Sequence, residues 1–210
     1  MINAYASRRQ RRRSGERGAV AVEAALVTPV LFLILFGIIE FGFVFKDYLS
    51  VTSATRAGAR TASAEPRVPG TSGIQYAQDA ANSFLREAAA LQMSNIQELW
   101  VYKADSNGYP VGVGNFSSCT TCVKFTVSQS WGGPPPAPTT VNGWYANSTY
   151  SNWPALSQNA CAGDPNRDSV GIYVKYSHPA ITGLIFNTFT LEDHTVMALE
   201  PVPITSTCRP

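Results

Sequence analysis

The chain has 210 residues and a formal net charge of +2, which suits one modest domain plus an anchor. Six of its sixteen basic residues precede Gly18, and the rest holds ten basic and thirteen acidic residues. A nucleic-acid-binding domain would carry its cations on the folded part, so we expect no nucleic-acid partner. The run RRQRRR at 8–13 would otherwise fit a nucleic-acid patch.

The first element in chain order is an apolar segment at 24–45, which reads AALVTPVLFLILFGIIEFGFVF. As a helix, its 22 residues span about 33 Å, enough to cross a hydrocarbon core of about 30 Å. The arginines before it predict that residues 1–18 stay in the cytoplasm and that the C-terminal part lies outside. We therefore expect a single-pass protein of the cytoplasmic membrane.

Two residues disturb this predicted span. Pro29 removes one helix hydrogen bond and favours a kink, which membrane helices tolerate. A carboxylate at the bilayer centre costs roughly 2.5–3.5 kcal/mol. Glu40 therefore either lies near the outer interface, with the apolar core starting near Ala21, or pairs with a partner subunit. A cleaved secretory signal is a further alternative. However, the apolar run is longer than the ~7–15 residues usual in a signal peptide, and the A-x-A cleavage pattern at 62–64 lies far beyond the end of the run.

The residues before the span have a characteristic order: a basic leader, Gly18, Ala19 and Glu23. This order resembles a type IV prepilin processing site. The resemblance implies that a prepilin peptidase removes residues 1–18 on the cytoplasmic side, which makes Glu23 the fifth residue of the mature chain. Glu23 would then pair with the freed amine of Ala19 on a neighbouring subunit, or simply lie at the inner interface among headgroups.

A longer stretch, about residues 16–64, is similar to TadE-like proteins, which are pseudopilins of the tight-adherence (Flp pilus) assembly system. The matching features are the Glu23 start, Pro29, the run GIIEFG at 37–42 and the run RAGAR at 56–60. The resemblance implies a minor pilin or pseudopilin that assists pilus assembly, with no catalytic residue, cofactor or metal. Its partners would be the lipid bilayer, prepilin peptidase, other pilins and pilus assembly proteins. The transmembrane packing residues would be Pro29, Gly37, Glu40 and Gly42.

The helix is predicted to continue past the membrane, so that 19–65 forms one transmembrane and juxtamembrane helix before Pro66. Ala54, Gly58 and Ala62 recur every four residues and leave one face with little bulk, which lets a helix or a sheet approach closely. Arg56 and Arg60 lie on another face. They form either a solvated stripe or a contact with lipid phosphates or a partner.

Residues 66–210 are predicted to form a small extracytoplasmic domain. Apolar spacing predicts a second helix over 74–92. Alternation and β-propensity predict strands at 98–103, 123–127, 170–176 and 195–200. The fold class is therefore α+β: a long N-terminal transmembrane helix that continues into a domain with a second helix and an antiparallel sheet of about four strands.

A long loop is predicted at about 132–168, starting with a proline-rich run at 132–138 that cannot be helix or inner strand. Its aromatic residues either bind a ligand or glycan or fold back onto the sheet. The four cysteines, Cys119, Cys122, Cys161 and Cys208, all follow the span and are disulfide candidates. We favour the pairs Cys119–Cys122 and Cys161–Cys208 over a zinc site or a redox pair.

The sequence carries no G-x-S-x-G, H-E-x-x-H or phosphate-binding glycine loop. His178 is expected in a loop before Pro179, and His194 at the start of the last strand. Asp168, Asp193 and His194 could assemble in space, which is the remaining route to a hydrolase. The alternative to a pilin-like role is an uncleaved, membrane-anchored surface protein whose aromatic loop binds a ligand.

Overall fold

The computed structural model describes residues 7–65, 73–127, 140–141, 144–147, 153 and 157–203. Cys208 and about half of the predicted long loop lie outside these residues. The described chain divides into two compact units. We call the helix up to Phe43 together with Ala180–Asn187 the anchor unit. The part from Val44 to Pro179 together with the chain from Thr188 onward is the sheet unit.

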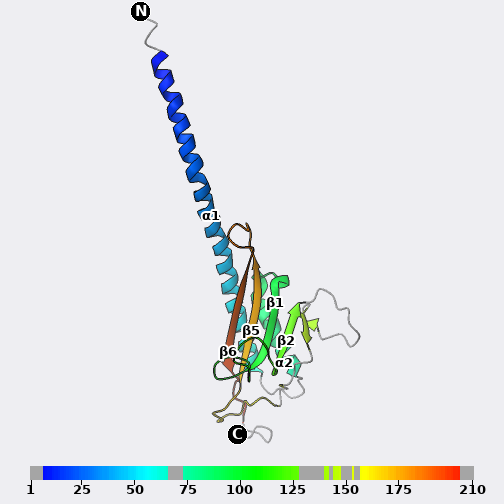
Figure 1. The fold of residues 1–210 in the computed structure, drawn as a ribbon. Coiled ribbons are helices and arrows are strands. Elements are labelled where there is room, and N and C mark those ends of the chain that lie inside the picture. Colours follow the sequence, from blue (N-terminus) through cyan, green and yellow to red (C-terminus); the bar gives the residue numbers. More distant parts are fainter. Residues whose placement is uncertain are drawn as a thin grey trace, which may run out of the picture. The chain divides into compact units, whose positions relative to one another are not determined.

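Helix α1, Ser7–Ala64, is one continuous helix (Figure 1). Pro29 lies inside it without ending it. It begins earlier than the predicted 19–65 helix, because the arginine-rich leader from Ser7 is also helical. The C-terminal end agrees with the prediction. Glu65 and Pro66 follow Ala64, and a residue before proline is disfavoured in helical geometry. The anchor unit thus consists of α1 up to Phe43, which includes the leader and most of the apolar run, and a short turn from much later in the chain.

The sheet unit contains the helix α2, Gly73–Glu87, followed by two 3-10 turns, Ala88–Ala90 and Met93–Asn95. Its strands are β1 Ile96–Ala104, β2 Cys122–Val127, β3 Thr140–Val141, β4 Trp144–Asn147, β5 Ser169–Pro179 and β6 Thr188–Ala198. They form one sheet in the order β3-β4-β2-β1-β5-β6, and every neighbouring pair is antiparallel. The α+β prediction is therefore confirmed. The four long strands match the predicted ones, and two short strands, β3 and β4, lie inside the stretch predicted as a loop.

The last strand differs most from its prediction. It begins at Thr188 rather than at residue 195, because β5 and β6 form a long hairpin whose register runs from Ser169↔Ala198 to Pro179↔Thr188. β6 is an edge strand with only one buried position, Leu191, so it lacks the alternating apolar pattern that sequence analysis depends on. The same hairpin places His178 and His194 inside strands, which corrects the predicted loop and strand-start positions.

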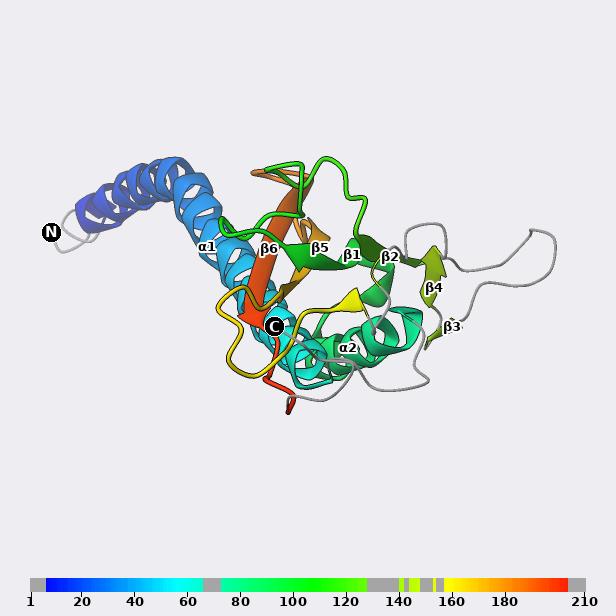
Figure 2. The same ribbon diagram turned by 90° about the horizontal axis from the view of Figure 1, so that it is seen from below.

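The core of the sheet unit lies between one face of the sheet and the two helices (Figure 2). Leu99 lies opposite Phe125 on β2 and opposite Val174 on β5. These side chains and those of the C-terminal part of α1 and of α2 form one buried cluster, which includes Ala54, Ala59, Ala62, Phe84 and Ile172. The opposite face is covered by a second cluster around Trp100, Tyr102, Tyr173 and Phe116.

The face of small residues predicted on α1 is confirmed as a packing surface. Ala54 and Ala62 are fully buried, and Gly58 is buried between them. A Cβ atom at Gly58 would lie 3.1 Å from the Ala80 carbonyl oxygen of α2 and 3.4 Å from the Phe84 Cβ. The absence of a side chain at this position therefore sets how closely the two helices approach.

Candidate functional site

The apolar surface of α1 is the most prominent functional feature of the anchor unit. Within the described part of the chain, Gly18–Ala64 contains the one helical stretch long and apolar enough to cross a membrane, and no part of its most apolar window is buried. The exposed side chains include Leu26, Leu31, Phe32, Leu33 and Ile38. A continuous apolar surface of this size needs lipid or other helices around it.

The predicted processing residues lie at the N-terminal end of this surface. Gly18, Ala19 and Glu23 are all exposed and helical. Ala19 and Glu23 are one helical turn apart, so they lie on the same face. The helix runs through the Gly18–Ala19 bond without interruption, so a peptidase would have to unwind it locally. Glycine makes that easier, because it favours the helix less than alanine by about 1 kcal/mol.

Glu40 is fully buried, and its carboxylate is bound by the anchor unit's own turn. The backbone N–H of Ile181 donates to Oε1 at 2.8 Å, and that of Thr182 donates to Oε2 at 3.2 Å. The Thr182 hydroxyl donates to Oε2 at 3.0 Å. Three donors from one turn therefore satisfy the carboxylate. The sequence had suggested either a position near the outer interface or a pairing with a partner subunit, and the structure gives Glu40 hydrogen-bond partners in the same chain.

The other predicted packing residues have different surroundings. A Cβ atom at Gly37 would lie 3.4 Å from the Ile185 Cδ1, so this glycine accommodates the turn. The Phe41 ring meets Phe186 edge-on at 6.1 Å between centroids. A Cβ atom at Gly42 would have no neighbour within 4 Å, and Pro29 is exposed. Gly37 and Glu40 thus face the turn, whereas Gly42 and Pro29 remain open to lipid or another helix.

A buried polar cluster in the sheet unit follows directly after the predicted span. Asp47 on α1 accepts from His178 Nδ1 at 2.7 Å and from the Tyr176 hydroxyl at 3.2 Å, and all three residues are buried. Lys46 approaches the same carboxylate at 3.5 Å from the surface. Sequence reasoning missed this cluster, because Asp47 and His178 are 131 positions apart and share no motif.

The histidines and acidic residues considered for hydrolysis do not come together. Asp168 forms an ion pair with Lys103 at 2.8 Å, and Asp193 accepts from Thr55 at 3.0 Å. His194 lies against the Phe116 ring at 4.9 Å between centroids. Adjacent strand residues point to opposite faces, so Asp193 and His194 cannot serve one site on the same face.

The cysteines and acidic residues give no metal centre among the residues that the structure describes. Cys119 and Cys122 form a disulfide, the pairing favoured from the sequence, with 6.0 Å between their Cα atoms. Cys161 is also disulfide-bonded, and its predicted partner Cys208 lies outside the described residues.

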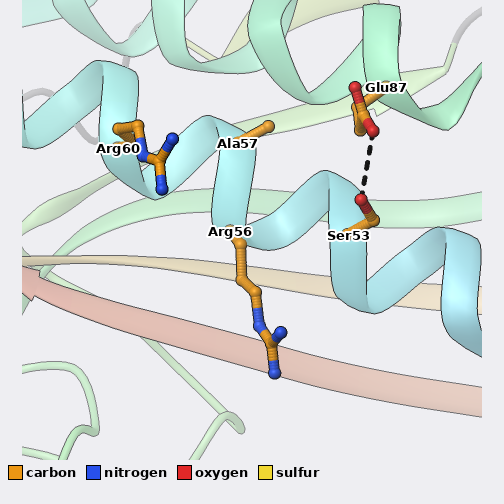
Figure 3. Close-up of a pocket in the computed structure, with 5 residues that line it drawn as sticks. All are labelled: Ser53, Arg56, Ala57, Arg60 and Glu87. Atoms are coloured by element: carbon orange, nitrogen blue, oxygen red, sulfur yellow. Dashed lines mark hydrogen bonds between the residues drawn. The ribbon is translucent and has the colours of Figure 1, made fainter.

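One open pocket of about 250 Å³ lies beside α1 and α2 in the sheet unit. Ser53, Arg56, Ala57, Arg60 and Glu87 line it, and the Ser53 hydroxyl donates to Glu87 Oε1 at 3.1 Å (Figure 3). The Arg56 side chain extends away from Glu87, and both arginines are exposed. This exposure fits both alternatives given for the two arginines, a solvated stripe or a contact with lipid phosphates or a partner, and the pocket is open rather than enclosed.

The comparisons with known proteins match the part of the chain that contains the exposed apolar helix. Residues 18–60 match the family model described as TadE-like protein. This segment covers about a fifth of the chain and includes the exposed apolar part of α1 together with Ala54 and Gly58 of its small-residue face. No curated protein and no solved structure matches the chain significantly. Over residues 18–60, which lie within α1, this chain is therefore similar to TadE-like proteins.

Proposed function

We propose that this protein is a TadE-like minor pilin or pseudopilin that assists assembly of a tight-adherence (Flp-type) pilus. The observation that carries the proposal is the coincidence of the family match at 18–60 with a helix whose apolar surface is exposed from Gly18 onward. Such a surface suits a subunit that is stored in the cytoplasmic membrane and then packs against other helices. The sheet unit would lie outside the cytoplasm, where its disulfides persist.

In this proposal, prepilin peptidase removes residues 1–18 on the cytoplasmic side. The new amine of Ala19 then lies one turn from Glu23 on the same exposed face. A neighbouring subunit's Glu23 can accept from that amine, and such a charge-assisted contact inside a low-dielectric environment fixes the axial register of packed helices. The chain would act through helix packing and surface contacts, without turning over a substrate.

The first test is the N-terminal residue of the protein isolated from its native host. Ala19 supports the pseudopilin. Met1 would instead indicate an uncleaved membrane-anchored surface protein, and Glu65 a domain released by a secretory peptidase.

A second test uses the Gly18→Leu variant, in which we expect the leader to stay attached. Gly15→Leu is the matched control, because it introduces the same side chain within the leader and should be processed normally. Normal processing of Gly18→Leu would refute the proposed site. For the register, Glu23→Ala should insert and be processed but reduce piliation, whereas Glu16→Ala, which is lost with the leader, should not. Unchanged piliation in Glu23→Ala would show that this residue is only an interface charge.

A further inference from the structure

The turn between β5 and β6, Ala180–Asn187, belongs to the anchor unit rather than to the sheet unit from which its flanking strands come. Its eight residues read AITGLIFN and include no charged side chain. Ile181, Leu184 and Ile185 are 58%, 66% and 46% exposed, although three of the turn's N–H and O–H donors are directed at Glu40. The turn thus presents apolar side chains outward and uses its polar groups on the helix.

The position of Glu40 sets the depth of this turn. Glu40 lies five residues before the end of the apolar run at Phe45, which corresponds to about 8 Å along a helix at ~1.5 Å per residue. If the apolar core instead begins near Ala21, Glu40 lies at its outer boundary. In both cases the turn bound to Glu40 lies at or just inside the outer headgroup region, where amphipathic elements bury their apolar faces by about 5–10 Å.

The hydrogen bonding of the turn fits that environment. A polar group that enters lipid must have its partners within the protein. The N–H groups of Ile181 and Thr182 bind the Glu40 carboxylate, and the N–H of Ala180 donates to the Asn187 carbonyl at 2.9 Å. The Leu184 N–H donates to the Thr182 hydroxyl at 3.4 Å. Four of the turn's N–H groups and the Glu40 carboxylate therefore have hydrogen-bond partners within the anchor unit, and the apolar side chains remain available to lipid.

We propose that the β5–β6 turn is a second membrane-contacting element, which inserts Ile181, Leu184 and Ile185 into the outer leaflet and is held there by Glu40. This inference rests on the proposed membrane anchoring through α1. The occupant is lipid rather than a second copy of the chain, because the turn is continuous with the lipid-facing surface of the same unit. The tether also accounts for a carboxylate within the apolar run, because it receives its donors from the turn.

The test measures the surroundings of nitroxide labels on the full-length protein in vesicles of phosphatidylethanolamine and phosphatidylglycerol. Labels are placed through Leu184→Cys in the turn, Leu31→Cys on the helix and Ser106→Cys in an exposed turn of the sheet unit. The parent chain treated with the same reagent measures background labelling. Collisions with oxygen, which dissolves in lipid, are compared with collisions with a water-soluble nickel chelate.

We expect the label at 184 to behave like the label at 31. At both positions, the ratio of oxygen collisions to nickel-chelate collisions should be several-fold higher than at 106. If the label at 184 behaves like the aqueous label at 106 while the label at 31 stays in lipid, the inference about the turn is overturned and the membrane anchoring through α1 stands. If 31 is also aqueous, the anchoring itself fails. If the label at 184 is protected from the nickel chelate only until the protein is diluted with lipid, the occupant is a second protein copy. That result would also overturn the inference.

The tether is tested by adding Glu40→Ala to the Leu184→Cys chain. Without the carboxylate, the N–H groups of Ile181 and Thr182 need water, so nickel collisions at 184 should rise several-fold while those at 31 stay unchanged. Thr182→Val, which removes one of the three donors, should have a smaller effect in the same direction. An unchanged label in Glu40→Ala would show that the carboxylate does not hold the turn in place.

Discussion

Replacement of Gly58 by leucine tests the close packing of α1 against α2 in the sheet unit. The first added atom, the Cβ, would lie 3.1 Å from the Ala80 carbonyl oxygen, which is backbone and cannot rotate away. The remaining side-chain atoms would have to enter space held by Phe84 and Ile172, both fully buried. Overpacking of this kind costs about 1–3 kcal/mol and occasionally more.

Helix propensity acts in the opposite direction. Replacing an interior helical glycine favours the helix by up to about 1 kcal/mol. For Gly58→Ala, this gain and the strain of one close Cβ nearly cancel, so we expect a stability within about 1 kcal/mol of the parent. For Gly58→Leu, the strain exceeds the gain, and we expect a loss of about 2 kcal/mol or more in the free energy of unfolding.

The assay is urea unfolding of the full-length protein in detergent micelles, followed by the fluorescence of the buried tryptophans Trp100 and Trp153. At a slope of about 2 kcal/mol per molar urea, the leucine variant should unfold at a urea concentration about 1 M lower. Gly42→Leu is the matched control, because a Cβ there meets nothing within 4 Å. An unchanged midpoint for Gly58→Leu would refute the close approach of α1 to α2.

Three further predictions use the same urea assay. A Cβ at Gly171 would collide with the Tyr102 ring, so Gly171→Ala should lose about 1–3 kcal/mol in the parent and less when it is added to Tyr102→Leu; an equal cost in both backgrounds would contradict the steric cause. Asp47→Ala leaves His178 buried without its carboxylate and should cost about 3 kcal/mol, whereas Lys46→Ala at the surface should cost less than about 1 kcal/mol; similar losses would argue against a buried pair. Burial raises the pKa of Tyr102, so the folded state favours the neutral phenol. The stabilisation from the buried neutral phenol of Tyr102 should hold below about pH 10 and be lost as the pH rises further. The free energy of unfolding should therefore fall less at alkaline pH in Tyr102→Phe than in the parent; identical alkaline profiles would exclude this residue as the cause.

Much of helix α1 could be predicted from local sequence. Membrane-spanning length, the placement of arginines and the stop at Pro66 depend only on nearby residues, and the structure contains the expected helix to Ala64. The four-residue spacing of Ala54, Gly58 and Ala62 likewise reports one helix face, and that face is buried. The processing residues remain a prediction, because exposure of a helix does not show where a peptidase cuts.

The surroundings of the charged residues were decided only by the tertiary structure. Glu40 is separated by 141 positions from Ile181, and Asp47 by 131 from His178. No local pattern encodes such contacts, because they depend on where the long β5–β6 hairpin ends. The length of the edge strand β6 was underestimated, because an edge strand with one buried side chain lacks the alternation of apolar and polar residues by which inner strands are predicted. The sequence by itself therefore determined that an apolar helix carries a carboxylate, and the fold determined which groups surround it.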